Sequence, residues 1–87
     1  MDVIFTKEAF EEYHYWIEND KRIFKKIYTL IQNIKRNKHS GLGHPKPLRN
    51  DKSGKWSRVI TEEHRLVYRI INNEIIEISQ CKGHYDD

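Results

Sequence analysis

The sequence predicts an α+β fold in one domain, residues 1–87, in the order strand, helix, helix, strand, strand, strand. The length of 87 residues leaves room for one domain with a thin core. Apolar residues recur at helical spacing between residues 7 and 36, whereas they alternate with polar residues between 56 and 81. A loop rich in glycine and proline, residues 39–48, separates the two patterns. We therefore expect an antiparallel sheet with both N-terminal helices packed on one face.

The first half predicts a short strand and two antiparallel helices. Residues 3–5 are all apolar and form the expected strand. Thr6 can cap the first helix, which we expect to end near Asn19, because its hydroxyl oxygen can accept from an amide of the first turn. Asp20 is the corresponding cap of the second helix. Each helix has an apolar stripe that is typical of a face packed on a core.

The second half predicts three consecutive antiparallel strands. Alternation over residues 56–61 and 64–71 indicates the first two, and residues 74–81 form the third. Asn72 and Asn73 are a hairpin signal, because asparagine tolerates the positive φ that such turns require.

Composition excludes several classes of protein. No apolar run approaches the ~18 residues of a membrane helix, and no Gly-rich phosphate loop is present. The first five residues are too short and too acidic for a signal peptide. A single cysteine, Cys81, cannot form an internal disulfide, so we expect a cytoplasmic protein without a membrane partner. His44, His64 and His84 with Cys81 lack a second closely spaced pair, so we expect no metal or other cofactor.

Charge is distributed unevenly along the chain. Residues 21–69 contain 14 Lys and Arg against 3 acids, whereas the remaining residues contain 2 against 10. A basic surface attracts phosphate polyanions. Charge alone therefore favours a nucleic-acid partner and leaves an acidic protein as the main alternative.

Residues near the strand ends have the chemistry for metal-free cleavage of RNA. The ribose 2′-OH is the nucleophile in that reaction, so the protein supplies a base, a cation for the phosphate and an acid for the 5′-oxygen. Arg65 lies on the expected central strand, and His84 and Tyr85 follow the last strand, so they could meet at one end of the sheet. The alternative, which spacing alone favours, is a surface arginine and a frayed tail.

Several motifs extend this reading over nearly the whole chain. The longest is WSRVITEEHRLVY at residues 56–68, and shorter matches lie at 13–16, 20–23, 41–48 and 84–85. In these motifs the sequence resembles the YoeB/Txe toxins, ribosome-dependent mRNA interferases of the RelE superfamily. The resemblance implies a microbial-RNase fold and a type II toxin–antitoxin toxin that cuts mRNA in the ribosomal A site. It also implies a YefM/Axe-like antitoxin as partner and a homodimer.

The resemblance implies a role for each matching residue. Arg65 corresponds to the catalytic arginine, His84 to the general acid, and Tyr85 to the tyrosine that orients the acid or stacks on a base. Glu63 corresponds to an acidic residue expected to orient Arg65 or to share the role of general base. Arg58 is expected to contact the RNA backbone. Three further basic residues complete the expected RNA-binding set: Arg49, Lys55 and Arg69.

Two positions depart from the family pattern. Val59 lies where a second arginine usually follows Arg58, and Lys46 lies where the family usually has its general-base glutamate. A lysine with the ordinary pKa of ~10.4 is about 0.04% unprotonated at pH 7, so it is a poor base unless burial or nearby cations lower that pKa. Lys46 can therefore be read as a working base or phosphate stabiliser, as the mark of a weakened enzyme, natural or altered, or as a neutral loop residue.

Two other functions are open alongside an mRNA-cleaving toxin. One is a module of the same fold that binds antitoxin or ribosome without cutting. The other, weaker alternative is a DNA-binding regulator, for which the sequence has no recognition-helix signal.

Overall fold

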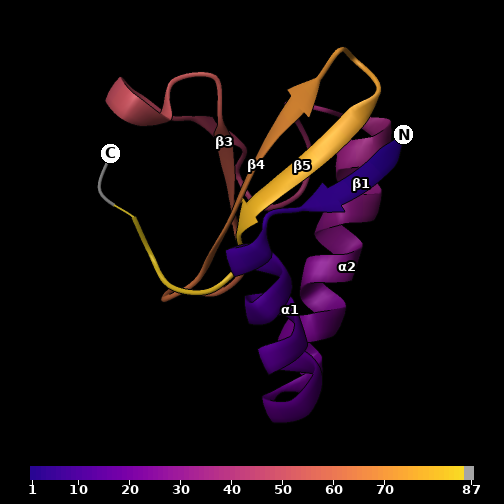
Figure 1. The fold of residues 1–87 in the computed structure, drawn as a ribbon, viewed down its shortest axis with the longest axis vertical. Helices are drawn as coiled ribbons and strands as arrows, with labels where there is room; N and C mark the ends of the chain where they lie inside the picture. The colour runs from indigo at the N-terminus through magenta and orange to yellow at the C-terminus, as the bar shows by residue number, and fades with distance from the viewer. Residues whose placement is uncertain (86–87) are drawn as a thin grey trace.

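The computed structural model describes residues 1–85 and has the predicted α+β architecture. Figure 1 shows both helices on one side of a single sheet, with the segment after the last strand on the other side. The elements are β1 (Asp2–Phe5), α1 (Lys7–Asn19), α2 (Lys21–Arg36), β2 (Lys46–Pro47), a 3-10 turn (Asn50–Lys52), β3 (Trp56–Val59), β4 (Arg65–Ile71) and β5 (Ile75–Gln80).

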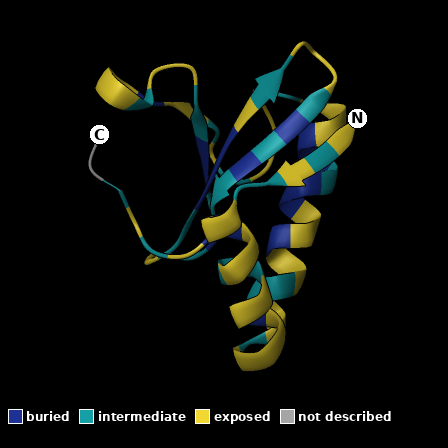
Figure 2. Ribbon diagram, in the orientation of Figure 1, coloured by how far each residue is buried: buried dark blue, intermediate teal, exposed yellow. Residues whose placement is uncertain are grey.

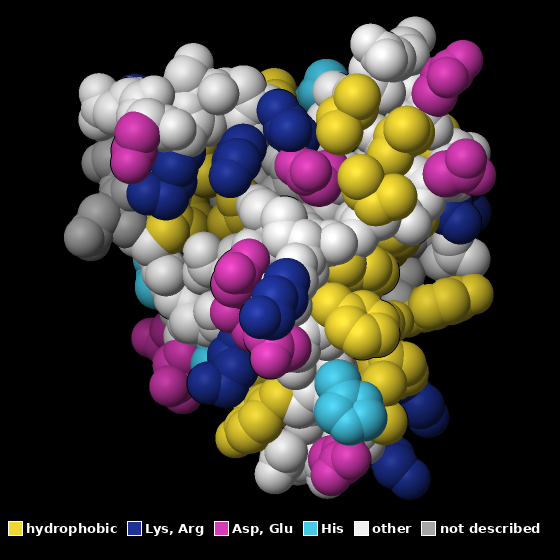
Figure 3. All heavy atoms as spheres, viewed as in Figure 1, with side chains coloured by type: hydrophobic (Ala, Val, Ile, Leu, Met, Phe, Trp, Pro, Cys, Tyr) yellow, Lys and Arg dark blue, Asp and Glu magenta, His cyan; other side chains and the backbone are white. Residues whose placement is uncertain are grey.

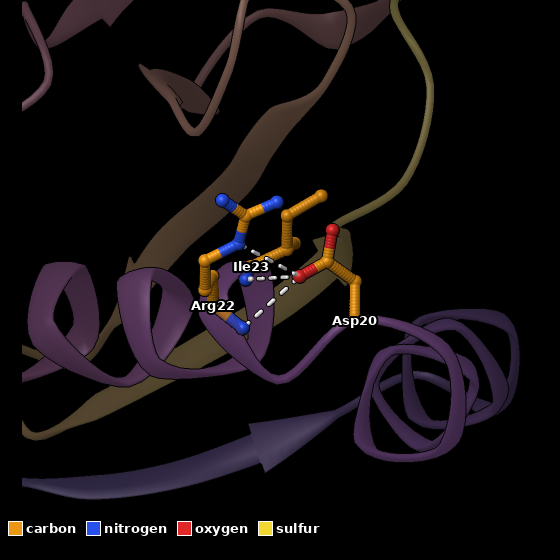
Figure 4. A network of polar contacts seen from close by, with 3 residues as sticks. All are labelled: Asp20, Arg22 and Ile23. Atoms are coloured by element: carbon orange, nitrogen blue, oxygen red, sulfur yellow. Dashed lines mark hydrogen bonds and ion pairs between the residues drawn. The ribbon is translucent and has the colours of Figure 1, made fainter.

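Both predicted helix caps are confirmed. The Thr6 hydroxyl accepts a hydrogen bond from the Ala9 amide at 3.2 Å. The Asp20 carboxylate accepts from the amides of Arg22 at 3.0 Å and Ile23 at 3.4 Å, as Figure 4 shows. Because Asp20 alone separates α1 from α2, its cap also fixes the turn that returns α2 alongside α1.

The sheet has the order β1-β5-β4-β3-β2. The predicted antiparallel neighbours β3, β4 and β5 are confirmed, and so is their hairpin turn, where Asn72 and Asn73 have φ of 51° and 61°. Two edge pairs were not predicted: β1 runs parallel to β5, and the short β2 runs antiparallel to β3. Parallel pairing of the first and last strands needs a long connection, which the rest of the chain supplies.

Figure 2 shows the buried residues concentrated where the helices meet the sheet. We call this side of the sheet the core face and the opposite side the outer face. Successive residues of a strand point to opposite faces, so each strand contributes to both. The centre of the core is formed by α2, β4 and β5, with Ile27, Leu30, Ile34, Leu66, Tyr68, Ile76 and Ile78 each without exposed surface.

Arg58 is fully buried on the core face, where it lies opposite Leu66 of β4. An arginine has five N–H donors. The guanidinium makes five hydrogen bonds, to Asn33 Oδ1 (2.6 Å), to the carbonyl oxygens of Asn37 (2.6 Å), Ser40 (2.8 Å) and Leu42 (3.0 Å), and to the Tyr68 hydroxyl (3.3 Å).

The prediction that Arg58 contacts RNA is therefore wrong for this structure. A guanidinium with 0% exposure and five internal acceptors has no donor left for a phosphate. The alternation of core-facing and outward-facing residues along this strand indicates that Arg58 faces the core. Trp56 and Ile60, two positions to either side, both pack in or against the core.

The Arg58 contacts hold the loop between α2 and β2. They satisfy carbonyl groups just beyond the end of α2, where helical hydrogen bonding stops. The Tyr68 hydroxyl donates in turn to the Lys38 carbonyl at 2.6 Å. Gly41 has φ of 100°, and a Cβ at this position would clash with Asn33 Oδ1, so the loop closes only around a glycine.

Cys81 is buried where the chain leaves β5. Its Sγ donates to the Ala9 carbonyl at 3.6 Å. Burial, with a smaller contribution from the negative charge of Glu12, raises the pKa of this thiol to about 12. A thiol with this pKa stays protonated and unreactive at neutral pH.

We expect Arg58→Lys to lower the free energy of unfolding by about 2–4 kcal/mol, because an ammonium has three donors and leaves buried carbonyls unpaired. Arg22→Lys is the matched control, since the Arg22 side chain is 96% exposed, and we expect it to change stability by less than about 0.5 kcal/mol. Urea denaturation of the purified chains measures both values. Equal stability of the two variants would contradict the role assigned to Arg58.

We expect the contribution of Cys81 to stability to decline above pH 9. The unfolded thiol loses its proton near the ordinary pKa of 9.0, whereas the native thiol keeps it up to about 12, so rising pH favours the unfolded chain. Urea denaturation between pH 8 and 10.5 measures this slope, with Cys81→Ala as control. A slope that is unchanged in Cys81→Ala would show that the thiol is not the group responsible.

Candidate active site

The outer face of the sheet carries predicted site residues from β2 and β4. On β3, Ser57 pairs with Lys46 on one side and with Val67 on the other, while Val59 pairs with Arg65. Directly paired residues point to the same face. Lys46 and Arg65 therefore flank β3 on the face opposite the helices. Because neighbouring strands are about 4.8 Å apart, β2 and β4 are separated by roughly twice that distance across β3.

The segment after β5 returns to this face and brings His84 to the beginning of β4. The Gly83 carbonyl accepts from the Arg65 amide at 3.0 Å. The Gly83 amide donates to His64 Nδ1 at 2.8 Å. Arg65 and the tail thus meet at one end of the sheet, which is the arrangement that spacing alone did not favour.

Tyr85 lies against β3 on the outer face. Its hydroxyl is 2.6 Å from Ser57 Oγ, close enough for a hydrogen bond in either direction. Gln80 Nε2 supports the approach of the tail, since it lies 3.0 to 3.2 Å from the carbonyl oxygens of residues 82–84. The ring of His84 lies tilted on that of Tyr85, with centroids 5.1 Å apart. The tail is thus held by hydrogen bonds as far as residue 85.

The exposed His84 imidazole uses one ring nitrogen for local contacts. Nδ1 lies 3.0 Å from the Tyr85 amide nitrogen and 3.1 Å from the Tyr85 carbonyl oxygen. A neutral ring can accept from the amide, and a protonated ring can donate to the carbonyl. Nε2 makes no hydrogen bond within residues 1–85. Among the described residues, Nε2 is therefore left available to contact a substrate.

Backbone carbonyls of the β3–β4 turn orient the Arg65 guanidinium. Nη1 donates to the carbonyl oxygens of Thr61 (2.7 Å), Glu62 (3.2 Å) and His64 (3.2 Å). Nε and Nη2 have no partner in the described part of the chain, so they can bind a phosphate. The prediction that Glu63 orients Arg65 is wrong for this structure, because no contact joins the two side chains within residues 1–85. A share of Glu63 in the base role stays a prediction.

The two departures from the family pattern both lie on the outer face. Lys46 is exposed on the edge strand β2. Val59 is half-buried beside Arg65, where an arginine would have added a second guanidinium. The outer face therefore has an extra ammonium at its edge strand and one guanidinium fewer at its centre.

The other basic residues expected to bind RNA lie at the margins. Arg69 is on β4, four residues beyond Arg65, and its Nε forms an ion pair with Glu77 at 2.7 Å. Arg49 is exposed and Lys55 is half-buried in the connection between β2 and β3. For these three residues, contact with RNA stays a prediction.

Within residues 1–85, no three His, Cys, Asp or Glu side chains come together as metal ligands. Neither described helix has the length and apolar character needed to cross a bilayer. A hollow of about 300 Å³ near the beginning of α2 contains none of the predicted site residues and is lined by Asp20, Arg22, Ile23, Lys26, Ile60 and Thr61.

The chain is similar to a known family of bacterial proteins. A family model described as the YoeB-like toxin of bacterial type II toxin-antitoxin system matches residues 5–85. Toxin YoeB of Escherichia coli strain K12 is 47% identical over 85 residues, 98% of this chain and 100% of that protein.

Solved structures of similar proteins indicate the same family. A YoeB/ParE toxin from Agrobacterium tumefaciens has a TM-score of 0.95 at 43% identity and covers 98% of this chain and 100% of its own. A YoeB dimer from Staphylococcus aureus has a TM-score of 0.90 at 42% identity and covers 98% of each chain. The match over nearly every residue shows that this chain belongs to the YoeB-like toxins of bacterial type II toxin–antitoxin systems.

Proposed function

We propose that this toxin is an endoribonuclease that cleaves mRNA in the ribosomal A site. The observation that carries the proposal is the hydrogen bond between the Arg65 amide and the Gly83 carbonyl, at 3.0 Å. This bond places the residue after Gly83, His84, at the beginning of the strand that carries the Arg65 guanidinium. The segments that carry Arg65 and His84, the proposed cation and acid of the reaction, therefore meet at one end of the sheet.

The proposed reaction uses the substrate's own nucleophile. The ribose 2′-oxygen attacks phosphorus and passes its proton to solvent water, and the bond from phosphorus to the 5′-oxygen breaks. Nε and Nη2 of Arg65 bind the phosphate oxygens as negative charge builds on them. His84 Nε2 gives a proton to the departing 5′-oxygen. The products are a 2′,3′-cyclic phosphate and a 5′-hydroxyl.

Tyr85 has a supporting role in this scheme. Its hydroxyl is engaged with Ser57 Oγ at 2.6 Å, so the phenol is anchored on β3. Its ring packs beside that of His84. The ring therefore either orients the imidazole or stacks on a base of the mRNA.

The group that removes the 2′ proton is where this chain differs from its family. Lys46 projects from β2 onto the outer face and is exposed. A lysine ammonium can pair with a phosphate but has no lone pair to accept a proton. Of the three readings of Lys46, we therefore propose the weakened enzyme, with substrate binding kept.

The proposed partners are the ribosome with its mRNA, a YefM/Axe-like antitoxin and a second copy of the chain. The structures from Staphylococcus aureus include a YoeB dimer and a YoeB–YefM complex, both with TM-scores of 0.90. Figure 3 shows hydrophobic side chains gathered over β1 and the neighbouring helix, where Ile4 is 42% and Phe10 63% exposed. Exposed apolar patches of this kind are typical of protein interfaces.

The alternative function is a toxin-fold module that binds antitoxin and ribosome without cutting. The specific observation in its favour is again the exposed ammonium of Lys46 at the position of the expected base. A gain-of-function substitution separates the two functions.

We expect Lys46→Glu to increase mRNA cleavage at least about tenfold, because a positioned general base contributes roughly 10²–10⁴-fold to rate. Mapping of mRNA 5′ ends on stalled ribosomes in a purified translation system measures this. Lys26→Glu, on the exposed side of α2, makes the same charge change away from the site and should give no gain.

Arg65→Ala in the Lys46→Glu background is the negative control and should abolish the breaks. Strong A-site cleavage by the unchanged chain, with no gain in Lys46→Glu, would contradict the weakened-enzyme reading. Absence of breaks from both chains would contradict the endoribonuclease proposal and favour the binding module.

A further inference from the structure

The C-terminal tail is held by residues that precede His84. The backbone of Cys81 and Gly83 makes four hydrogen bonds to α1 and to residues 64 and 65. They are Cys81 N to Glu12 Oε1 (2.8 Å), Trp16 Nε1 to the Cys81 carbonyl (2.9 Å), Gly83 N to His64 Nδ1 (2.8 Å) and Arg65 N to the Gly83 carbonyl (3.0 Å). His84 itself is exposed, and its imidazole contacts only the adjacent Tyr85 within residues 1–85. The position of its imidazole therefore depends on the segment before it.

Gly83, which directly precedes His84, is hydrogen-bonded to other elements through both its amide and its carbonyl group. Its φ of 84° marks the point at which the tail changes direction. Its carbonyl accepts from the Arg65 amide, a bond that does not depend on any side chain, and from Gln80 Nε2 at 3.1 Å. Its amide donates to His64 Nδ1, and this bond depends on the imidazole alone.

The His64 ring is fixed from both sides. The turn before β4 sets its backbone, because the His64 amide donates to Thr61 Oγ1 at 3.2 Å and its carbonyl accepts from the Ile60 amide at 3.0 Å. The ring packs edge-on against Trp16, with centroids 4.7 Å apart. Trp16 also holds the Cys81 carbonyl, so α1 orients both the tail and the ring that binds it.

We propose that His64 is a positioning residue that places the His84 imidazole beside Arg65 through the Gly83 amide. Its Nδ1 lone pair is the acceptor that fixes where the tail turns. His64 does not touch the reacting atoms in this scheme. The kinetic part of this inference rests on the proposed endoribonuclease function, whereas the structural part stands without it. A misplacement of about 1 Å at a catalytic group can reduce rate roughly 10²-fold.

Two amide variants test the proposal. In His64→Asn the side-chain oxygen lies near the position of Nδ1, whereas in His64→Gln it lies one bond farther out. The Asn and Gln side chains are both neutral and both end in a carboxamide. They differ mainly in how far that group lies from the backbone. His14→Asn, at a site on α1 whose side chain is 65% exposed, is the control for loss of a histidine.

Hydrogen exchange of the Gly83 amide, followed by NMR on the full chain, gives the structural readout. We expect exchange within about threefold of the parent in His64→Asn and at least about tenfold faster in His64→Gln. Cleavage is measured for the same variants in the Lys46→Glu background. We expect kcat to fall about 10- to 100-fold in His64→Gln, with KM within about threefold, and to be largely retained in His64→Asn.

Equal Gly83 exchange in the two variants would overturn the proposal. A loss of kcat in His64→Gln without faster exchange would also overturn it, because the imidazole would then act by another route. If His64→Gln does not fold, loss of Gly83 protection in a folded His64→Asn is the overturning result, and retained protection is the supporting one. If nothing in the Lys46→Glu background cleaves mRNA, the endoribonuclease proposal fails, and the exchange comparison still decides the role of His64.

Discussion

The Arg58 guanidinium donates five hydrogen bonds inside the protein, so one buried cation joins the end of α2, the loop after it and the central strands β3 and β4. Burying a charge is costly unless its donors are satisfied, and here three of the five acceptors are backbone carbonyl groups of the loop after α2. The loop that Arg58 closes leads directly into β2. The same contacts that satisfy the buried charge therefore determine where Lys46 enters the outer face.

In β3, the residue that stabilises the fold lies directly between two residues that face the candidate site. Arg58 faces the core opposite Leu66, whereas its neighbours Ser57 and Val59 face outward opposite Val67 and Arg65. Ser57 then anchors Tyr85 of the tail at 2.6 Å. A slip of one residue would exchange the two faces, which would bury the site side chains and expose the apolar ones. The tightly bonded Arg58 opposes such a slip.

Local signals predicted the helices, their caps at Thr6 and Asp20, and the hairpin at Asn72 and Asn73, because each depends on residues within one turn of one another. The pairing of β1 with β5 has no local signal, since it joins the two ends of the chain. The prediction for Arg58 was wrong because it considered only the charge of the side chain. It did not consider that Trp56 and Ile60, two positions to either side, place Arg58 on the core face of the strand.

The residue types of the candidate site were predictable from the sequence. The groups that hold these residues in position were less so. The sequence and its family resemblance indicated Arg65, His84 and Tyr85, and the structure brings the segments that carry them together. The carbonyls that orient the Arg65 guanidinium, and the imidazole of His64 that holds Gly83, come from a turn whose geometry no pattern specified.

Attack by the 2′-oxygen is the central claim of the proposed chemistry, and one substitution in the RNA tests it directly. The measurement is the extent of cleavage, by the Lys46→Glu chain on stalled ribosomes, of an mRNA with a single 2′-deoxynucleotide at the mapped break. The account predicts that cleavage at this position is lost, whereas a 2′-deoxynucleotide three positions upstream has little effect. Undiminished cleavage at the deoxy position would contradict it, because the nucleophile would then have to come from water or from the protein.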